Sequence, residues 1–253
     1  MPHVGDLAAV VLAAGAGTRL RPLTRLRPKA LCPVDNVPLV DLAVGWARAA
    51  TPAVAVNVHH GRTAMEVHLA GRVHLSIEEP VALGTAGGVG NLKDWVDGRA
   101  VLTTNADAWH DAQLDVFARE WDSERVRVLV AGEEFGPRVG VVASLLPWRD
   151  VEQLPAKPAG LYELCWGPAL DAGRLDVAHH TGRFFDCGTP GGYLAANMAA
   201  SDGRPVVGPG ASVDGSLERS VVWPGAPVFA QEHLVDAVRA DEHVTVLVRD
   251  GDG

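Results

Sequence analysis

The stretch LAAGAGTRLRPLTRLRPKAL, residues 12–31, is the most informative part of this chain. It follows the continuous apolar run 7–12, which is typical of a buried parallel strand. Small residues and glycines come next, and five basic residues follow them: Arg19, Arg21, Arg25, Arg27 and Lys29. A backbone that a ligand can approach closely, beside concentrated positive charge, suits a polyphosphate. Because open α/β sheets bind ligands at the carboxyl ends of their strands, this order predicts an anion site there.

Other interpretations of this stretch are weaker. No GxxxxGK[ST] run exists, which excludes a Walker P-loop, and residues 15–20 lack the third glycine of the dinucleotide fingerprint, which disfavours an NAD-linked oxidoreductase. A solvated arginine loop is the plainest alternative. The net charge of the chain is −9, however, so the basic cluster is local and opposes the overall sign. That contrast favours a specific anion site and argues against nucleic acid or an anionic membrane as a partner of the chain.

Three further segments carry motifs. Residues 79–88 read EPVALGTAGG, residues 102–107 read LTTNAD, and residues 185–190 read FDCGTP, with Tyr193 and Asn197 shortly after. Together with LAAGxGTRLxPLTxxxPKxL, these four segments stand in the order found in the sugar-1-phosphate nucleotidyltransferases, the NDP-sugar pyrophosphorylase family. The chain resembles this family over most of its first 200 residues.

The resemblance implies a Mg²⁺-dependent transferase. A sugar 1-phosphate oxygen attacks the α-phosphorus of a nucleoside triphosphate, and pyrophosphate leaves. By resemblance, Arg19 and Lys29 are the catalytic residues, and Asp107 and Asp186 bind the Mg²⁺ ion. The implied nucleotide-binding residues are Leu12, Ala13, Ala14, Gly15, Gly17, Thr18, Glu79, Gly84, Thr85 and Ala86.

The identity of the base depends on Glu79, which stands where the family reads the base. A carboxylate only accepts hydrogen bonds. Guanine offers N–H donors at adjacent positions and uracil offers one, which favours GTP and then UTP as the substrate.

The sequence does not identify the acceptor, because the interval between Asp107 and Asp186 is short. In the family, a YGVV element and an EKP element enclose the sugar. This interval matches them only in part, at Gly140–Val142 and Ala156–Pro158. The favoured alternative aligns residues 139–147 with the later GxYxF strand, which makes Lys157 a loop residue. Hexose, heptose and N-acetylmuramic acid 1-phosphates all stay open as acceptors, and so does phosphocholine, the substrate of related cytidylyltransferases. A non-catalytic, nucleotide-binding regulatory relative is the alternative from another functional class.

The alternation of elements predicts an α/β fold with a doubly wound, mostly parallel, Rossmann-like sheet. The expected strands are 7–12, 53–58, 73–77, 100–104, 126–131 and 139–143, and the expected helices are 37–50, 62–70, 86–95, 111–121 and 190–200. Residues 206–228 no longer alternate between strand and helix patterns and instead combine glycines with aliphatic residues. Valines 207, 213, 222 and 228 at roughly hexapeptide spacing predict a short C-terminal left-handed β-helix-like fragment. The predicted domains are therefore 1–203, catalytic, and 204–253, the extension. A Gly/Pro-rich linker to a last strand at 243–249 is the alternative.

Composition sets the remaining expectations. Of the 253 residues 47% are hydrophobic and 21% charged, as in ordinary globular proteins. Cys32, Cys165 and Cys187 form no CxxC pair, which indicates a reducing, cytoplasmic setting without disulfides or a zinc site. The sequence contains no apolar run of membrane-spanning length and no signal-peptide pattern. The scattered histidines, including His59 and His60, are interpreted as surface or loop residues. A homo-oligomer formed through the C-terminal segment is also expected.

Overall fold

Two units divide the residues that the computed structural model describes, which are 7–119 and 121–249. The first unit comprises the chain up to Gly15, Leu42–Ala106 and Asp111–Gly182. The second comprises Ala16–Asp41, Asp107–His110 and the chain from Arg183 on. The boundary expected from the sequence, between residues 203 and 204, lies inside the second unit. The two units differ in which residues pack together, whereas the expected boundary separates a catalytic part from an extension, so that boundary stays a prediction.

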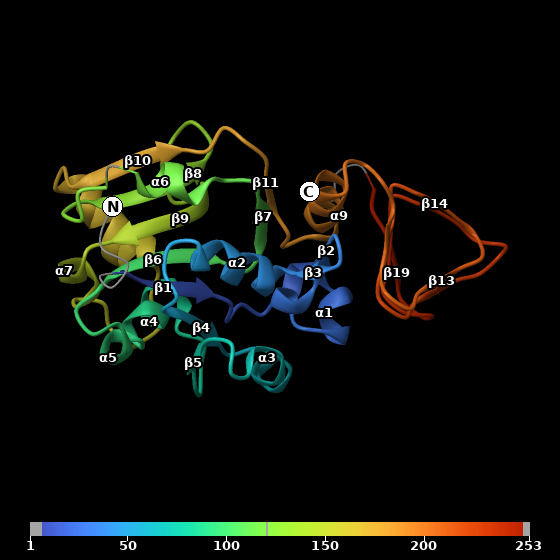
Figure 1. The fold of residues 1–253 in the computed structure, drawn as a ribbon, viewed down its shortest axis with the longest axis horizontal. Coiled ribbons are helices and arrows are strands. Elements are labelled where there is room, and N and C mark those ends of the chain that lie inside the picture. The colour runs from blue at the N-terminus through green and yellow to red at the C-terminus, as the bar shows by residue number, and fades with distance from the viewer. Residues whose placement is uncertain (1–6, 120, 250–253) are drawn as a thin grey trace. The chain divides into compact units, whose positions relative to one another are not determined.

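Seven described strands form the central sheet of the first unit, in the order β10-β8-β9-β6-β1-β4-β5 (Figure 1). All neighbouring strands run parallel except β9, which is antiparallel to both β6 and β8. This confirms the mostly parallel α/β sheet. The strands are β1 (Leu7–Leu12), β4 (Val54–Val58), β5 (His74–Ile77), β6 (Ala100–Asn105), β8 (Val126–Ala131), β9 (Gly140–Leu146) and β10 (Leu175–His179).

The helices associated with this sheet are mostly short. The predicted helix 86–95 is two helices, α4 (Gly84–Gly90) and α5 (Lys93–Val96), and the predicted helix 111–121 is shortened to α6 (Leu114–Ala118). α2 (Leu39–Arg48) begins in the second unit and continues into the first. The others are α3 (Arg62–Leu69), α7 (Trp148–Val151), the π-helical turn η4 (Tyr162–Trp166) and α8 (Gly167–Asp171).

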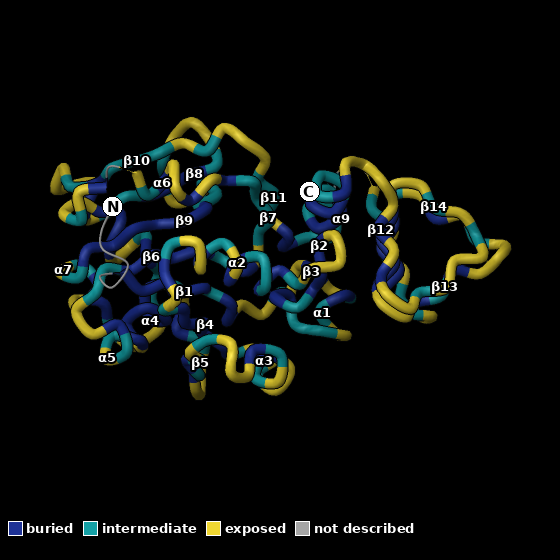
Figure 2. Tube along the Cα trace, in the orientation of Figure 1, coloured by how far each residue is buried: buried dark blue, intermediate teal, exposed yellow. Residues whose placement is uncertain are grey.

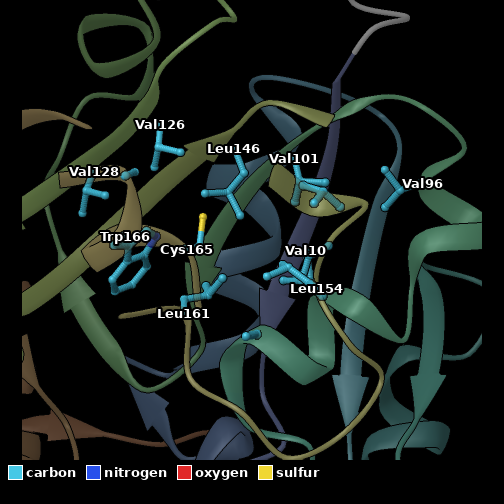
Figure 3. Packing of buried hydrophobic residues seen from close by; sticks show 14 of the residues in the cluster. Val10, Val96, Val101, Val126, Val128, Leu146, Leu154, Leu161, Cys165 and Trp166 are labelled. Atoms are coloured by element: carbon cyan, nitrogen blue, oxygen red, sulfur yellow. The ribbon is translucent and has the colours of Figure 1, made fainter. Parts of the chain in front are cut away.

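One apolar cluster fills a face of the sheet. Val10, Val101 and Val128 project from its strands and pack with residues such as Leu154 and Leu161 from the segments that cover them (Figure 3). Figure 2 shows the strands β1, β6 and β9 as largely buried. Full burial of one such side chain contributes about 1.5–3 kcal/mol. This core fixes the register in which Leu12, at the end of β1, lies opposite Asn57 of β4 and Asn105 of β6.

The second unit begins with short turns that carry the basic residues of the stretch 12–31, which we call the opening motif. These are η2 (Thr18–Leu20), α1 (Leu23–Leu26) and η3 (Lys29–Leu31), followed by the hairpin of β2 (Pro33–Val34) and β3 (Val37–Pro38). β7 (Ala108–His110) pairs antiparallel with β11 (Phe184–Asp186). The helix α9 (Pro190–Ala200) then starts with proline in its first turn, and the side chain of Thr189 caps it by accepting from Gly192 N at 3.1 Å.

Residues 206–247, which we call the C-terminal coil, form short paired strands, so they are not an unpaired linker. Its strands are β12 (Val206–Val207), β13 (Ser212–Val213), β14 (Ser216–Glu218), β15 (Val221–Val222), β16 (Pro227–Val228), β17 (His233–Val235), β18 (Ala237–Arg239) and β19 (Thr245–Leu247). Four pairs are parallel, and β18 pairs antiparallel with β19. The valines of the predicted repeat are partners: Val207 lies opposite Val222, and Val213 opposite Val228.

No helix in residues 7–119 and 121–249 is both long enough and apolar enough to cross a membrane.

Candidate functional site

Asp107 and Asp186 lie next to each other because of the β7–β11 ladder. Asp186 is the cross-strand partner of Ala108, the residue after Asp107. The backbone N–H of Cys187 donates to the Asp107 carbonyl at 3.0 Å and extends the pairing by one residue. The side chains of both aspartates are about half exposed, 53% for Asp107 and 49% for Asp186. Two segments far apart in sequence therefore present two carboxylates at one place.

Lys29 bridges these two carboxylates. Its Nζ lies 3.1 Å from Asp107 Oδ2 and 3.5 Å from Asp186 Oδ1, and its side chain is only 8% exposed. The glycine of the opening motif makes room for it. Gly17 has a φ of +61°, and a Cβ at that position would lie 2.9 Å from Lys29 Cβ. A side chain at residue 17 would thus be strained in its backbone and would displace the lysine.

Arg19 adds a second cation to Asp186, with its Nη2 at 3.2 Å from Asp186 Oδ2. Partial burial raises the pKa of Asp186, but the charge of Lys29, the Gly188 N–H and the Arg19 guanidinium outweigh burial and hold that pKa below its usual range. Asp186 is therefore an anion at neutral pH. The four residues that the motifs single out for catalysis and metal binding, Arg19, Lys29, Asp107 and Asp186, form one charged cluster within the second unit.

Another arginine of the opening motif has a different place. The guanidinium carbon of Arg27 lies 4.3 Å from the centre of the Trp223 ring, in the C-terminal coil. This cation–π contact gives Arg27 a packing role. Arg19 and Lys29 of the basic run thus belong to the charged cluster, whereas Arg27 packs on an aromatic ring and Arg21 and Arg25 are exposed.

The turn after β1 is held by side chains from the end of β4. Ala13 N donates to Asn57 Oδ1 at 2.7 Å, and His60 Nδ1 lies 2.9 Å from the Ala14 carbonyl. Leu12 O accepts from Ala106 N at 3.0 Å. The backbone of Leu12, Ala13 and Ala14 therefore has a defined conformation within the first unit. Neither Asn57 nor His60 was among the predicted site residues, although an asparagine in the apolar run VAVNV was a signal.

Of the two adjacent glutamates, Glu79 is the accessible one. Its side chain is 64% exposed and forms an ion pair with Arg62. Glu78, which was not predicted, is 1% exposed. It accepts hydrogen bonds from Leu83 N at 2.7 Å and from Asn57 Nδ2 at 2.7 Å. Glu79 therefore keeps a surface position from which it can meet a ligand, whereas Glu78 is part of the interior.

The LGTAGG motif begins α4 and packs against the segment 159–161. Thr85 Oγ1 accepts from Leu161 N at 2.8 Å, and Ala86 N donates to Ala159 O at 3.0 Å. A Cβ on Gly84 would lie 2.6 Å from the Ala159 carbonyl oxygen. These contacts give Gly84, Thr85 and Ala86 a role in local packing beside the nucleotide-binding role expected for them.

A cavity of about 240 Å³ opens in the first unit beside these elements. Leu12, Thr85 and Asn105 line it from the ends of β1, α4 and β6, and the other lining residues come from β6, from 139–143 in and before β9, and from 160–166 in and before η4. Among the described residues that line it, Glu163 is the one charged side chain, and Tyr162 and Trp166 are its aromatic rings. The indole Nε1 of Trp166 is buried and finds no hydrogen-bond partner among residues 7–119 and 121–249.

Tyr193 and Asn197, which follow the FDCGTP segment, form hydrogen bonds to other parts of the chain. The hydroxyl of Tyr193 donates to Pro33 O and accepts from Trp223 Nε1 at 2.9 Å. Asn197 accepts from Asp35 N at 3.0 Å and donates to Tyr193 O at 2.9 Å. Cys187 is fully buried, and burial raises the pKa of its thiol, so it is a core residue and not a nucleophile.

Within residues 7–119 and 121–249, no three or more His, Cys, Asp or Glu side chains gather closely enough to hold a metal ion by themselves. A cation at Asp107 and Asp186 would need further ligands from a substrate or water.

Comparison with known proteins identifies relatives. Residues 8–161 match the family model described as "Nucleotidyl transferase". Over 133 residues the chain is 39% identical to an N-acetylmuramate alpha-1-phosphate uridylyltransferase of Caulobacter vibrioides. That alignment covers 47% of this chain and 55% of the relative, so the chain spans about half the length of the curated relative it matches.

Solved structures share the fold. A putative glucose-1-phosphate thymidylyltransferase from Bacillus anthracis, in complex with a sucrose, superposes with a TM-score of 0.68 at 16% identity, covering 78% of this chain and 96% of that one. HddC from Yersinia pseudotuberculosis superposes with a TM-score of 0.61 at 17% identity, covering 76% and 99%. The same protein complexed with GMP-PN gives a TM-score of 0.60 at 16% identity, again covering 76% and 99%.

Proposed function

This chain belongs to the nucleotidyl transferase family, and we propose that it transfers a nucleoside monophosphate from a nucleoside triphosphate to a sugar 1-phosphate and releases pyrophosphate. The observation that carries this proposal is the charged cluster, in which Lys29 bridges Asp107 and Asp186 and Arg19 contacts Asp186. A site that must bring two phosphorylated anions together needs fixed cations, and Lys29 is already held in position by its burial.

The proposed reaction forms a bond between an acceptor phosphate oxygen and the α-phosphorus and breaks the bond from that phosphorus to the β-phosphate oxygen. No general base is needed, because the attacking phosphate is already ionised. Lys29 would hold the phosphates as a point charge, and the planar guanidinium of Arg19 would stabilise the departing pyrophosphate. Backbone groups at Leu12, Ala13, Ala14 and Gly15 would hold the nucleotide, with Gly17 and Thr18 near its outer phosphates.

The same cluster fits a Mg²⁺ ion. Asp107 and Asp186 offer oxygen ligands that are half exposed, and Mg²⁺ is commonly bound by one or two carboxylates together with substrate phosphates. We propose that these two aspartates hold it. When bound, the ion neutralises part of the charge on the phosphates.

For the acceptor we propose the cavity beside Leu12 and Thr85. Glu163 is the one charged residue among those described in its lining, and because it is acidic, it disfavours a sugar that carries a carboxylate, such as N-acetylmuramic acid. The alternative of a phosphocholine cytidylyltransferase rests on Tyr162 and Trp166. Aromatic rings beside a carboxylate suit a quaternary ammonium group.

For the nucleotide, Glu79 favours GTP by its hydrogen-bonding chemistry, and the name of the Caulobacter relative favours UTP. We expect Glu79→Gln to change the ratio of kcat/KM for GTP over UTP by roughly fivefold, since one hydrogen bond to a base contributes on the order of 1 kcal/mol. The matched control is Glu66→Gln, because Glu66 also pairs with Arg62 but lies on α3. An unchanged nucleotide ranking in Glu79→Gln would refute this assignment of the base-reading residue.

The test of the proposed function is pyrophosphate release with Mg²⁺, crossing the four NTPs and dTTP against sugar 1-phosphates and phosphocholine. We expect release that depends on one pair, with a neutral sugar 1-phosphate preferred over N-acetylmuramic acid 1-phosphate. Release with phosphocholine and CTP would instead establish the cytidylyltransferase. Nucleotide binding by calorimetry without release from any pair would favour the non-catalytic, regulatory alternative.

We further propose that the C-terminal coil is a short left-handed β-helix fragment. Its parallel partners lie 15 residues apart in two pairs, such as Val206 with Val221, and 17 apart in the others, such as Val221 with Val238. A stack this short buries little apolar surface of its own, and it is anchored within the second unit by Trp223. A cytoplasmic location and a homo-oligomer formed through this coil also stay proposals.

A further inference from the structure

Three buried hydrogen bonds join the turn after β1 to the start of α4. Ala13 N donates to Asn57 Oδ1, Asn57 Nδ2 donates to Glu78 Oε1, and Leu83 N donates to Glu78 Oε2, each at 2.7 Å. Ala13 belongs to the turn assigned to the nucleotide, and Leu83 immediately precedes the assigned residues Gly84–Ala86. The Asn57–Glu78 pair thus connects the turn after β1 to the start of α4 by hydrogen bonds, and both segments are proposed to bind the nucleotide.

This link is sealed from solvent. Asn57 is 2% exposed and Glu78 is 1% exposed. Gly88, the last glycine of the LGTAGG motif, lies directly over it: a Cβ there would be 2.6 Å from Asn57 Nδ2 and 2.9 Å from Glu78 Oε1. The glycine therefore permits the close approach that excludes water from the pair.

The direction of every hydrogen bond is fixed by chemistry. Both ends of the chain are backbone N–H groups, which only donate, so Asn57 must present its oxygen to Ala13 and its NH₂ to Glu78. Both oxygens of Glu78 then accept. A buried polar network of this kind costs desolvation energy and adds little stability over well-packed apolar residues. What it adds is a single, defined separation between the Ala13 and Leu83 peptides.

We propose that Asn57 and Glu78 are positioning residues for the nucleotide. They hold the turn after β1 and the start of α4 at the separation that the bound nucleotide requires, so that little ordering remains to be done on binding. This inference rests on the proposed function, because it assumes that both segments bind the nucleotide. Neither side chain is assigned a contact with the ligand.

Each single substitution reverses one donor or acceptor. In Glu78→Gln an NH₂ group must face either Asn57 Nδ2 or Leu83 N, and in Asn57→Asp a carboxylate must face Glu78. A buried donor or acceptor that is left unpaired loses its interaction with water without gaining another partner, which costs free energy. If the cost falls on nucleotide binding, the dissociation constant for the Mg²⁺–NTP complex rises by about tenfold or more in each variant.

The double variant Asn57→Asp, Glu78→Gln is the decisive rescue. The glutamine NH₂ then donates to the aspartate, its oxygen accepts from Leu83 N, and the other aspartate oxygen accepts from Ala13 N. Every group is paired again, and the net charge equals that of the original pair. We expect the dissociation constant to return to within about threefold of the unmodified protein.

The matched control is Thr51→Val. The hydroxyl of Thr51 is buried and donates to Leu7 O at 2.7 Å, at the opposite end of β1. This variant also loses a buried hydrogen bond of the first unit, so it should lower the melting temperature while leaving nucleotide affinity unchanged.

The experiment measures nucleotide affinity by titration calorimetry, melting temperature, and kcat and KM separately for each variant. Single variants that bind the nucleotide within twofold of the unmodified protein would overturn the inference and leave a purely structural pair. A double variant that regains its melting temperature but not its affinity would overturn it as well. If the unmodified protein binds no NTP, the proposed function itself is refuted. If the unmodified protein turns over and the single variants do so equally well, only this inference is refuted.

Discussion

Asp107→Asn should abolish most pyrophosphate release while the chain keeps its fold. Asp107 supplies one of the two carboxylates to which we assign the Mg²⁺ ion, and an amide is a neutral and much weaker ligand. Loss of one preorganised electrostatic contact at a site of phosphate chemistry costs roughly 10²–10³-fold in kcat. Turnover should also need more Mg²⁺ to reach half of its maximum.

The fold should survive because Asp107 contributes little stability through its side chain. That side chain is 53% exposed, and its ion pair with Lys29 is therefore largely screened. The hydrogen bond that continues the β7–β11 ladder comes from the Asp107 carbonyl, which asparagine retains. Lys29 also keeps its second partner, Asp186.

The control for this substitution is Asp115→Asn. Asp115 lies on α6, is 61% exposed and pairs with Arg119 at 3.5 Å, so the variant removes a surface carboxylate of similar exposure from a different place. Pyrophosphate release measured across Mg²⁺ concentrations, beside melting curves, separates loss of the ion from loss of the fold. Full activity of Asp107→Asn in magnesium would contradict the metal assignment.

The sequence predicts strands best where they are buried on both faces. β1, β4, β6 and β8 are mostly buried and rich in aliphatic residues, and the expected ranges match them within one or two residues. β10 was missed, because only Leu175 of its five residues is buried and Asp176 and His179 interrupt its apolar pattern. The β7–β11 ladder, which brings the two aspartates together, was also missed. Strands of three residues give no periodicity to detect.

The site shows a similar limit. Motifs identified Lys29, Asp107 and Asp186, which the structure brings together. They did not reveal Asn57 and Glu78, because that pair depends on the register in which Leu12 faces Asn57. Glu78 and Glu79 are neighbours in sequence, and one is buried while the other is exposed, so composition alone could not tell which is which. Conversely, Tyr193 and Asn197 belong to a motif and yet bind other parts of the chain.

Trp223 is the residue on which the attachment of the C-terminal coil depends. It is 1% exposed, donates to the Tyr193 hydroxyl at 2.9 Å, and carries Arg27 on its ring face. Tyr193, itself fully buried, connects it to the β2–β3 hairpin through Pro33 O. One indole therefore joins the coil, α9 and the opening motif of the second unit.

Trp223→Ala should lower the free energy of unfolding by about 3–5 kcal/mol, the usual cost of removing a large buried aromatic side chain. For a chain of this size that corresponds to a fall in melting temperature of roughly 10 °C or more. Trp223→Phe keeps one aromatic ring at the site but loses part of the buried indole together with its N–H donor, so its cost should be smaller than that of Trp223→Ala. Denaturant unfolding measures the loss of stability in both variants. Equal, small losses in both would mean that the coil contributes little to the second unit, and that the motif residue Tyr193 is buried for a reason other than holding it.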